Sequence, residues 1–229
     1  MCATDGIIYP GFPYKNKDDN SIILPDIEEQ MGHITTECLR TLVVFIGGAA
    51  DDDYQPMLKG VFSRYAQDYG QGKERKQDVC YSEHGGGNVP PVMQKWHDAN
   101  QKIVLVGHSW GGDRVICLAE DNTSIPIELL VTLDPVSRGK SGKQTKPVNV
   151  KRWMNIYVDY KFADYSSPND IARAGGAWEE CSCADMNKAI NVGEIQNESG
   201  RKIISKINDY GHADADVMFS EVIGDVNVM

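Results

Sequence analysis

Three continuous apolar runs constrain the fold of this chain most strongly. They are TLVVFI at 41–46, IVLV at 103–106 and IELLVTL at 127–133. Apolar residues without alternation are typical of strands that are buried on both faces. Segments with helical periodicity lie between or after the runs, at 56–70, 90–101 and 110–121. Strands that alternate with helices predict a mainly parallel sheet with helices on both faces.

Length and composition are consistent with one domain over residues 1–229. The chain is 41% hydrophobic, which is enough apolar material for a substantial core. Residues 1–40 are rich in Gly, Pro, Asp and Asn, so we expect an irregular segment with room for one short helix at 25–33. The α/β core is expected at 41–224.

Charge and hydropathy disfavour two classes of function. The formal net charge of −10 is the wrong sign for a general nucleic-acid binder. No apolar run reaches the roughly 18–20 residues that span a bilayer. The N-terminal MCATDGIIYPGF lacks the basic and apolar regions of a signal peptide. We therefore expect synthesis in the cytoplasm, with any membrane contact peripheral.

The six cysteines have irregular spacing, which does not favour a metal site. Cys181 and Cys183 form a C-x-C pair, whereas zinc sites and redox motifs usually use C-x-x-C. We expect no metal and no cofactor, and the disulfide state is left open.

The apolar run at 103–106 leads directly into Gly-His-Ser-Trp-Gly at 107–111. Between a strand and a helix, Gly-x-Ser-x-Gly places the serine on a strained turn and exposes its hydroxyl above the sheet. The helix N-terminus behind it supplies N–H groups and a positive dipole end. The pattern predicts that Ser109 is a nucleophile, and a tight turn in another kind of α/β protein is the alternative.

A serine hydroxyl is a weak nucleophile and needs a base. When the nucleophile lies on such a turn, the acid and then the histidine follow it in the chain. The only downstream histidine is His212, whereas the other four, at 33, 84, 97 and 108, precede Ser109. His212 is therefore the predicted base, on a loop at the rim of the molecule; a surface histidine capping a helix is the alternative.

The predicted acid is Asp134, which ends the apolar run at 127–133. A carboxylate at a buried strand end costs free energy unless it has partners. Because ligands bind outside the carboxyl ends of parallel strands, Asp134, Ser109 and the loop at 47–53 should share one rim. Asp159 and Asp164, which follow the next strand, are the alternative acids.

The motif VGHSWGG, followed by TLDPV, resembles the lipase-type α/β-hydrolases, whose acid follows the sixth strand in an L-D-P context. VVFIGGAADDD resembles their oxyanion strand and loop. The segments RWMNIYVDY, SPNDIARAGGAW and YGHADADVMF are similar to bacterial α/β-hydrolases found as toxin domains of polymorphic and type VI secretion effectors. The resemblance implies the α/β-hydrolase fold and ester hydrolysis, often of phospholipids. It also implies delivery into target cells and a cognate immunity protein.

An enzyme of this type needs two backbone N–H donors for the oxyanion. We expect one from Trp110, the residue after the nucleophile, and one from Gly48 or Ala49, after the strand at 41–46. The acidic run Asp51–Asp53 in the same loop is interpreted as a solvated face, with calcium binding as the alternative.

A basic segment at 137–152 follows Asp134, so we expect it to border the same rim. Each basic residue near an anionic leaflet contributes roughly 1 kcal/mol to binding. The segment predicts a cradle for anionic lipid headgroups, and a solvated loop is the alternative. The candidate headgroup ligands are Lys140, Lys143, Lys146 and Lys151.

These features together predict a serine ester hydrolase of the lipase or phospholipase type, acting on membrane lipid esters. One alternative is a thioesterase or acyltransferase on a soluble acyl substrate. Another is an inactive hydrolase-fold binding protein.

Overall fold

The computed structural model describes residues 2–4, 7–9, 40–49, 51, 57–70, 77–137 and 145–229. The helix expected at 25–33 lies outside these residues, as do Lys140 and Lys143.

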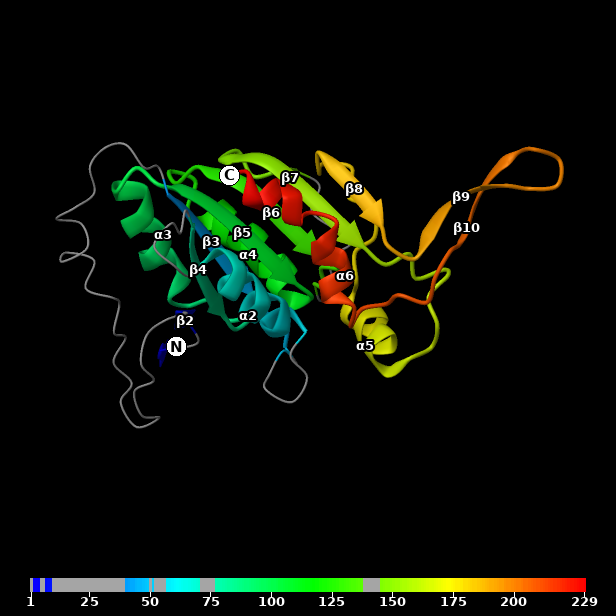
Figure 1. Ribbon diagram of the computed structural model, residues 1–229, viewed down its shortest axis with the longest axis horizontal. Coiled ribbons are helices and arrows are strands. Elements are labelled where there is room, and N and C mark those ends of the chain that lie inside the picture. The colour runs from blue at the N-terminus through cyan, green and yellow to red at the C-terminus, as the bar shows by residue number, and fades with distance from the viewer. Residues whose placement is uncertain are drawn as a thin grey trace.

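The described residues form a central sheet of eight strands (Figure 1). Its order is β1-β2-β4-β3-β5-β6-β7-β8, and the six strands from β4 to β8 are parallel, whereas β1 and β2 are antiparallel. The strands are β1 (Cys2–Thr4), β2 (Ile7–Tyr9), β3 (Thr41–Ile46), β4 (Gln77–Ser82), β5 (Lys102–His108), β6 (Ile127–Leu133), β7 (Val150–Tyr157) and β8 (Met186–Ala189).

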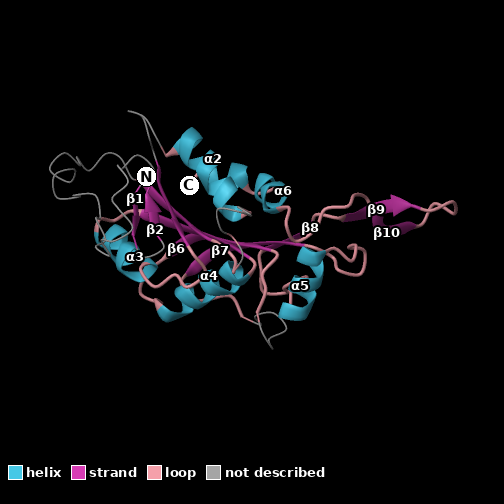
Figure 2. Cartoon of the chain, turned by 90° about the horizontal axis from the view of Figure 1, so that it is seen from below, coloured by secondary structure: helices cyan, strands magenta, loops and turns pink. Residues whose placement is uncertain are grey.

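Helices cover both faces of this sheet (Figure 2). On one face lie α2 and α6, and on the other lie α3, α4 and α5. A short helix, α7, packs on the α2 side through Val226. The helices are α2 (Leu58–Tyr69), α3 (Val89–Asp98), α4 (Trp110–Asp121), α5 (Ser167–Gly175), α6 (Ala215–Ser220) and α7 (Ile223–Asn227).

The two faces explain why the strand sequences are continuously apolar. Successive side chains of a strand point to opposite faces, so Val43 and Phe45 pack with Phe62 of α2, while Val44 and Ile46 pack on the α3 and α4 side. Each such buried side chain contributes about 1.5–3 kcal/mol relative to an exposed one. The predicted fold class, an α/β-hydrolase fold with a mainly parallel sheet, is confirmed.

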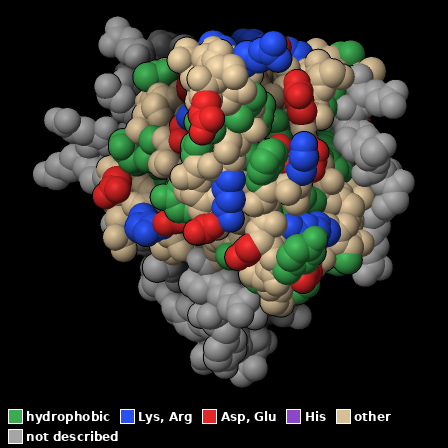
Figure 3. Space-filling model, turned by 90° about the vertical axis from the view of Figure 1, so that its right-hand side faces the viewer, with side chains coloured by type: hydrophobic (Ala, Val, Ile, Leu, Met, Phe, Trp, Pro, Cys, Tyr) green, Lys and Arg blue, Asp and Glu red, His purple; other side chains and the backbone are tan. Residues whose placement is uncertain are grey.

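The sequence did not predict several elements between β7 and the C-terminus. These are α5, β8 and a separate two-stranded hairpin of β9 (Val192–Gln196) and β10 (Lys202–Lys206). The hairpin projects from the body of the molecule (Figure 1). Seen from this end, hydrophobic, acidic and basic side chains are interspersed on the surface (Figure 3).

After His212 the chain forms two short helices, α6 and α7. Within the described ranges, no helix has the length and apolar character needed to cross a membrane.

Candidate active site

Ser109 lies on a sharp turn between β5 and α4, with φ of 56° and ψ of −127°. A positive φ costs a non-glycine residue of order 1–3 kcal/mol. The glycines around it allow the ends of β3 and β5 and the start of α4 to pack closely. A Cβ on Gly107 would lie 2.2 Å from the Gly111 carbonyl oxygen, and one on Gly111 would lie 2.0 Å from that of Ile46. The turn therefore tolerates only glycine at these two positions.

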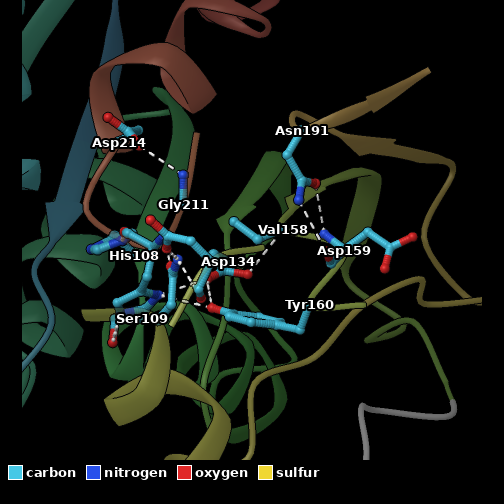
Figure 4. Close-up of polar contacts among 12 residues, drawn as sticks. His108, Ser109, Asp134, Val158, Asp159, Tyr160, Asn191, Gly211 and Asp214 are labelled. Carbon is cyan, nitrogen blue, oxygen red and sulfur yellow. Dashed lines mark hydrogen bonds and ion pairs between the residues drawn. The ribbon is translucent and has the colours of Figure 1, made fainter. Parts of the chain in front are cut away.

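Ser109, His212 and Asp134 form a continuous chain of hydrogen bonds at the carboxyl edge of the sheet. Figure 4 shows Ser109 and Asp134 in this cluster. His212 Nε2 lies 3.0 Å from Ser109 Oγ, and His212 Nδ1 lies 2.6 Å from Asp134 Oδ2. The three residues are 8%, 5% and 0% exposed, respectively. His212 lies on a loop at the rim of the sheet, as predicted, but its side chain is buried.

The partners of His212 determine its tautomer. A carboxylate only accepts hydrogen bonds, so Nδ1 carries the proton that faces Asp134. Nε2 of the neutral ring then has a lone pair directed at Ser109 Oγ. This arrangement can accept the serine proton as the oxygen becomes a nucleophile.

Asp134 itself is fully buried and has hydrogen-bond donors on both oxygens. The backbone N–H of Val158 donates to Oδ1 at 3.1 Å, and the Tyr160 hydroxyl donates to Oδ2 beside the imidazole. These donors offset the cost of burying the carboxylate. Sequence reasoning missed both donors, because they come from the loop after the neighbouring strand.

The two alternative acids are engaged elsewhere. Asp159 Oδ1 accepts from the backbone N–H of Lys161 at 3.0 Å. Asp164 Oδ1 accepts from the Asn169 side-chain amide at 2.6 Å. Among the described contacts, no hydrogen bond joins either carboxylate to His212. Of the three candidates, the structure places Asp134 against the imidazole.

The backbone of His212 is held at both its N–H and its carbonyl group. Asn169, buried in α5, accepts from the His212 N–H at 2.7 Å. His108 Nε2 donates to the His212 carbonyl oxygen at 2.8 Å. The sequence excluded His108 as the base, since it precedes Ser109, but it indicated no role for Asn169.

His108 remains neutral in this position. Burial, and then the nearby His212, lower the pKa of His108 to about 3. The two rings lie 4.8 Å apart between centroids. His108 therefore places no positive charge beside the imidazole of His212.

The predicted oxyanion donors lie against the serine. A Cβ on Gly48 would be 2.8 Å from Ser109 Cβ and 3.2 Å from Oγ. Ala49 and Trp110 line the same cavity as Ser109. Trp110 is the first residue of α4, and N–H groups in the first turn of a helix have no partner within that helix. The geometry therefore brings both predicted backbone segments to the nucleophile.

Asp51 is not on a solvated face, so that prediction is wrong for this residue. It is 5% exposed and accepts from the Lys59 N–H, at 3.1 and 3.0 Å to its two oxygens, and from the Tyr81 hydroxyl at 3.1 Å. Burial raises the pKa of Asp51. The carboxylate caps the N-terminus of α2 and so anchors the loop that carries Gly48. Asp52 and Asp53 lie outside the described residues.

The prediction that the basic segment borders the active rim is wrong for Lys146 and Lys151. The chain crosses back to the amino edge of the sheet before β7, where Val150 pairs with Ile127. Lys146 binds Asp185 at 2.9 Å, and Lys151 binds Glu128 at 2.5 Å. Their charges are thus paired at the edge opposite Ser109.

A cavity of about 730 Å³ opens beside the serine. Its walls come from the loop after β3, from α2, from α5 and from the loop that carries His212. Most of the lining is apolar, and the charged side chains described there are Arg64 and Asp216, 3.6 Å apart and both exposed. The lining residues are Ala49, Met57, Arg64, Ser109, Trp110, Val136, Ser167, Pro168, Ile171, Ala172, Gly175, His212, Ala213 and Asp216.

The described part of the chain contains no group of three or more His, Cys, Asp or Glu residues placed to hold a metal ion. Cys181 and Cys183 lie in the loop before β8, with their sulfurs 2.7 Å apart and no disulfide between them.

No protein-family model matches the chain, and no curated protein matches it in sequence. Among solved structures, it is similar to a predicted CIB-like hydrolase from Thermoplasma acidophilum, with 12% identity, a TM-score of 0.46, and coverage of 86% of this chain and 90% of the other. It is also similar to the type II thioesterase BorB of the borrelidin biosynthetic cluster (12% identity, TM-score 0.34, coverage 66% and 82%). A metagenomic carboxyl esterase also matches (12% identity, TM-score 0.35, coverage 97% and 84%). At these low values, the function has to be argued from the site itself.

Proposed function

We propose that this chain is a serine ester hydrolase in which Ser109 is the nucleophile. The observation that carries the proposal is the hydrogen-bonded chain from Ser109 Oγ through the His212 ring to Asp134. The positions of Gly48 and Trp110 support it, because Gly48 lies against Ser109 and Trp110 lines the same cavity, where backbone N–H groups could stabilise an oxyanion.

The proposed reaction has two stages. Ser109 Oγ attacks the ester carbonyl carbon while His212 Nε2 takes the hydroxyl proton, and the carbonyl oxygen becomes an oxyanion. The carbonyl re-forms as the alcohol leaves with the proton from His212, which produces an acyl-serine. Water, activated by the same imidazole, then releases the acid and restores Ser109. Asp134 holds the Nδ1–H tautomer and stabilises the transient imidazolium.

The cavity favours an apolar acyl group as the part of the substrate bound beside the serine. Its volume of about 730 Å³ is within the range of small-molecule sites, and residues such as Met57, Val136 and Ile171 provide an apolar wall. We therefore extend the proposal to lipid esters as the substrate class. Delivery into other cells and an immunity partner, which the family resemblance implies, stay predictions.

A fluorophosphonate probe tests the serine directly, because it labels only an activated serine. Wild-type protein should be labelled at Ser109 and should hydrolyse 4-nitrophenyl esters. Ser109→Ala should lose the label and lower kcat by roughly 10⁶-fold, while its unfolding midpoint stays close to that of the wild type. Ser82→Ala is the matched control: this serine is also buried at the carboxyl end of a parallel strand, but its hydroxyl bonds to the Glu83 carbonyl. Activity of Ser109→Ala within tenfold of wild type would overturn the proposal.

The substrate class requires a second measurement. Hydrolysis of 4-nitrophenyl esters should rise with acyl length from acetate to octanoate, if the apolar cavity holds the acyl group. Lipid profiling of vesicles exposed to wild type and to Ser109→Ala should then show released fatty acid only with the wild type. Faster turnover of an acyl thioester than of the matched oxygen ester would replace the lipid ester with a thioester as substrate.

A further inference from the structure

Tyr160 is a polar residue of the site that the proposed reaction does not yet use. It lies in the loop between β7 and α5, and its side chain points toward Asp134 (Figure 4). Its hydroxyl donates to Asp134 Oδ2, the same oxygen that accepts from His212 Nδ1 at 2.6 Å. The phenol oxygen is 3.5 Å from Nδ1, too far for a good hydrogen bond. Two donors therefore share one carboxylate oxygen.

The phenol is a permanent donor in this position. Burial, and then the negative charge of Asp134, raise the pKa of Tyr160 far above its ordinary value, so the hydroxyl keeps its proton. The ring is held from outside by Arg173, whose guanidinium lies 5.2 Å from the ring centroid. Tyr160 is absent from the described lining of the cavity. It can therefore act on Asp134 without touching the substrate.

The other charged or titratable groups around this cluster come from several elements. His108 of β5 faces the His212 ring and stays neutral. Arg173 of α5, and Glu179 more weakly, act on Tyr160. Asp214, on the His212 loop itself, accepts from the Gly211 N–H at 2.7 Å, and Asp216 lies farther along the cavity wall. Of the described charged groups, Asp134 is the one hydrogen-bonded to the imidazole.

From these contacts we infer that Tyr160 is a positioning residue that, by donating to Asp134 Oδ2, lets His212 remain a neutral base at lower pH. The inference rests on the proposed function. A hydrogen bond to a carboxylate reduces the negative charge that its oxygen presents to other donors. The imidazolium form of His212 is then less favoured, so acid protonates the base less readily. The same bond fixes the plane of the carboxylate and, through it, the imidazole.

Tyr160→Phe removes the donor and keeps the ring. We expect the acidic midpoint of the pH profile of kcat/KM for 4-nitrophenyl butyrate to rise by about 0.5–1 pH unit. This is smaller than the shift that the loss of a hydrogen bond made directly to the titrating group would cause, because Tyr160 acts on His212 only through Asp134. KM should change less than twofold, because Tyr160 does not line the cavity. Tyr165→Phe, which changes an 89% exposed side chain in the same loop, should keep the wild-type midpoint.

A second variant gives the opposite shift and covers the case in which Tyr160→Phe does not fold. Site-specific incorporation of 3-fluorotyrosine at position 160 provides a more acidic phenol and thus a stronger donor. The acidic midpoint should then fall below that of the wild type. A role for Tyr160 in folding alone would not move the two midpoints in opposite directions.

Two outcomes separate the failure of this inference from the failure of the proposed function. If Ser109→Ala keeps activity, the proposed function fails and the inference fails with it. The other outcome is that Ser109→Ala is inactive, while the folded variants at position 160 keep the wild-type midpoint or shift it in the same direction as each other. Tyr160 then does not set the protonation of His212, and only the inference is overturned.

Discussion

Replacing His108 with Gln tests whether a buried neutral imidazole makes this fold sensitive to acid. His108 is fully buried, and its Nε2–H donates to the His212 carbonyl oxygen. Among the described residues, its Nδ1 has no hydrogen-bond partner. A Gln side-chain amide can make the same donation and cannot be protonated in this pH range. The variant therefore removes the titration while keeping the contact that holds His212.

The expected magnitude follows from the pKa of His108, which is 6.5 as the ordinary value and about 3 in the folded chain. Above roughly pH 6.5 the imidazole is neutral in both the folded and the unfolded chain, so it adds no pH dependence. Below that value the unfolded chain binds a proton that the folded chain excludes, and stability falls until about pH 3. Between about pH 7 and about pH 5, the free energy of unfolding should fall by about 2 kcal/mol through this residue alone. That is a large share of the 5–15 kcal/mol typical of a folded domain.

Urea unfolding, followed by tryptophan fluorescence and circular dichroism, measures this effect. The quantity to compare is the unfolding free energy of the wild type minus that of His108→Gln, taken at both pH values. This difference should be about 2 kcal/mol smaller at about pH 5 than at about pH 7, because only the wild type loses stability through His108. Ser109→Ala is the control, since it alters the adjacent residue but keeps His108, and it should keep the wild-type pH dependence. The same difference at both pH values would mean that His108 is not held neutral by the fold.

Two further predictions concern the site. Asp134→Asn should lower kcat by something near 10⁴-fold, because it favours the wrong imidazole tautomer. Asp164→Asn should lower kcat less than tenfold. Steady-state kinetics that show the reverse ranking would assign the acid to the loop after β7. Gly48→Ala should lower kcat at least about tenfold, because the added Cβ would lie 2.8 Å from Ser109 Cβ and disturb the oxyanion position. Gly85→Ala, whose Cβ would meet nothing within 4 Å, is its control, and equal activity of the two variants would exclude a role for Gly48.

Local patterns in the sequence were sufficient to predict the part of the fold that carries the nucleophile. The apolar runs that became β3, β5 and β6 are continuous because both faces of each strand are buried. The periodic segment at 56–70 became α2, and apolar residues on one of its faces, Leu58 and Phe62 among them, are buried. The strand–turn–helix at Ser109 is encoded within a few residues, since only glycine fits at 107 and 111. Chain order then indicated which histidine and which aspartate the fold would bring to the serine.

The surroundings of those three residues were decided by the tertiary structure. Tyr160 and Asn169 reach Asp134 and His212 from elements more than 25 residues away in sequence, and no local pattern indicated a role for either side chain. Asp51 looked like a solvated acid, but its buried contacts with Tyr81 and α2 exist only once the sheet and helix have packed. Lys151 follows Asp134 in the chain, yet it lies at the amino edge of the sheet, opposite Ser109. The reason is that a parallel strand must begin at the edge opposite to the one where the preceding strand ended. Residues close in sequence therefore share a site reliably only within one local turn, such as that at Ser109. Between strands of a parallel sheet, the crossover connections determine which side chains lie at the same edge.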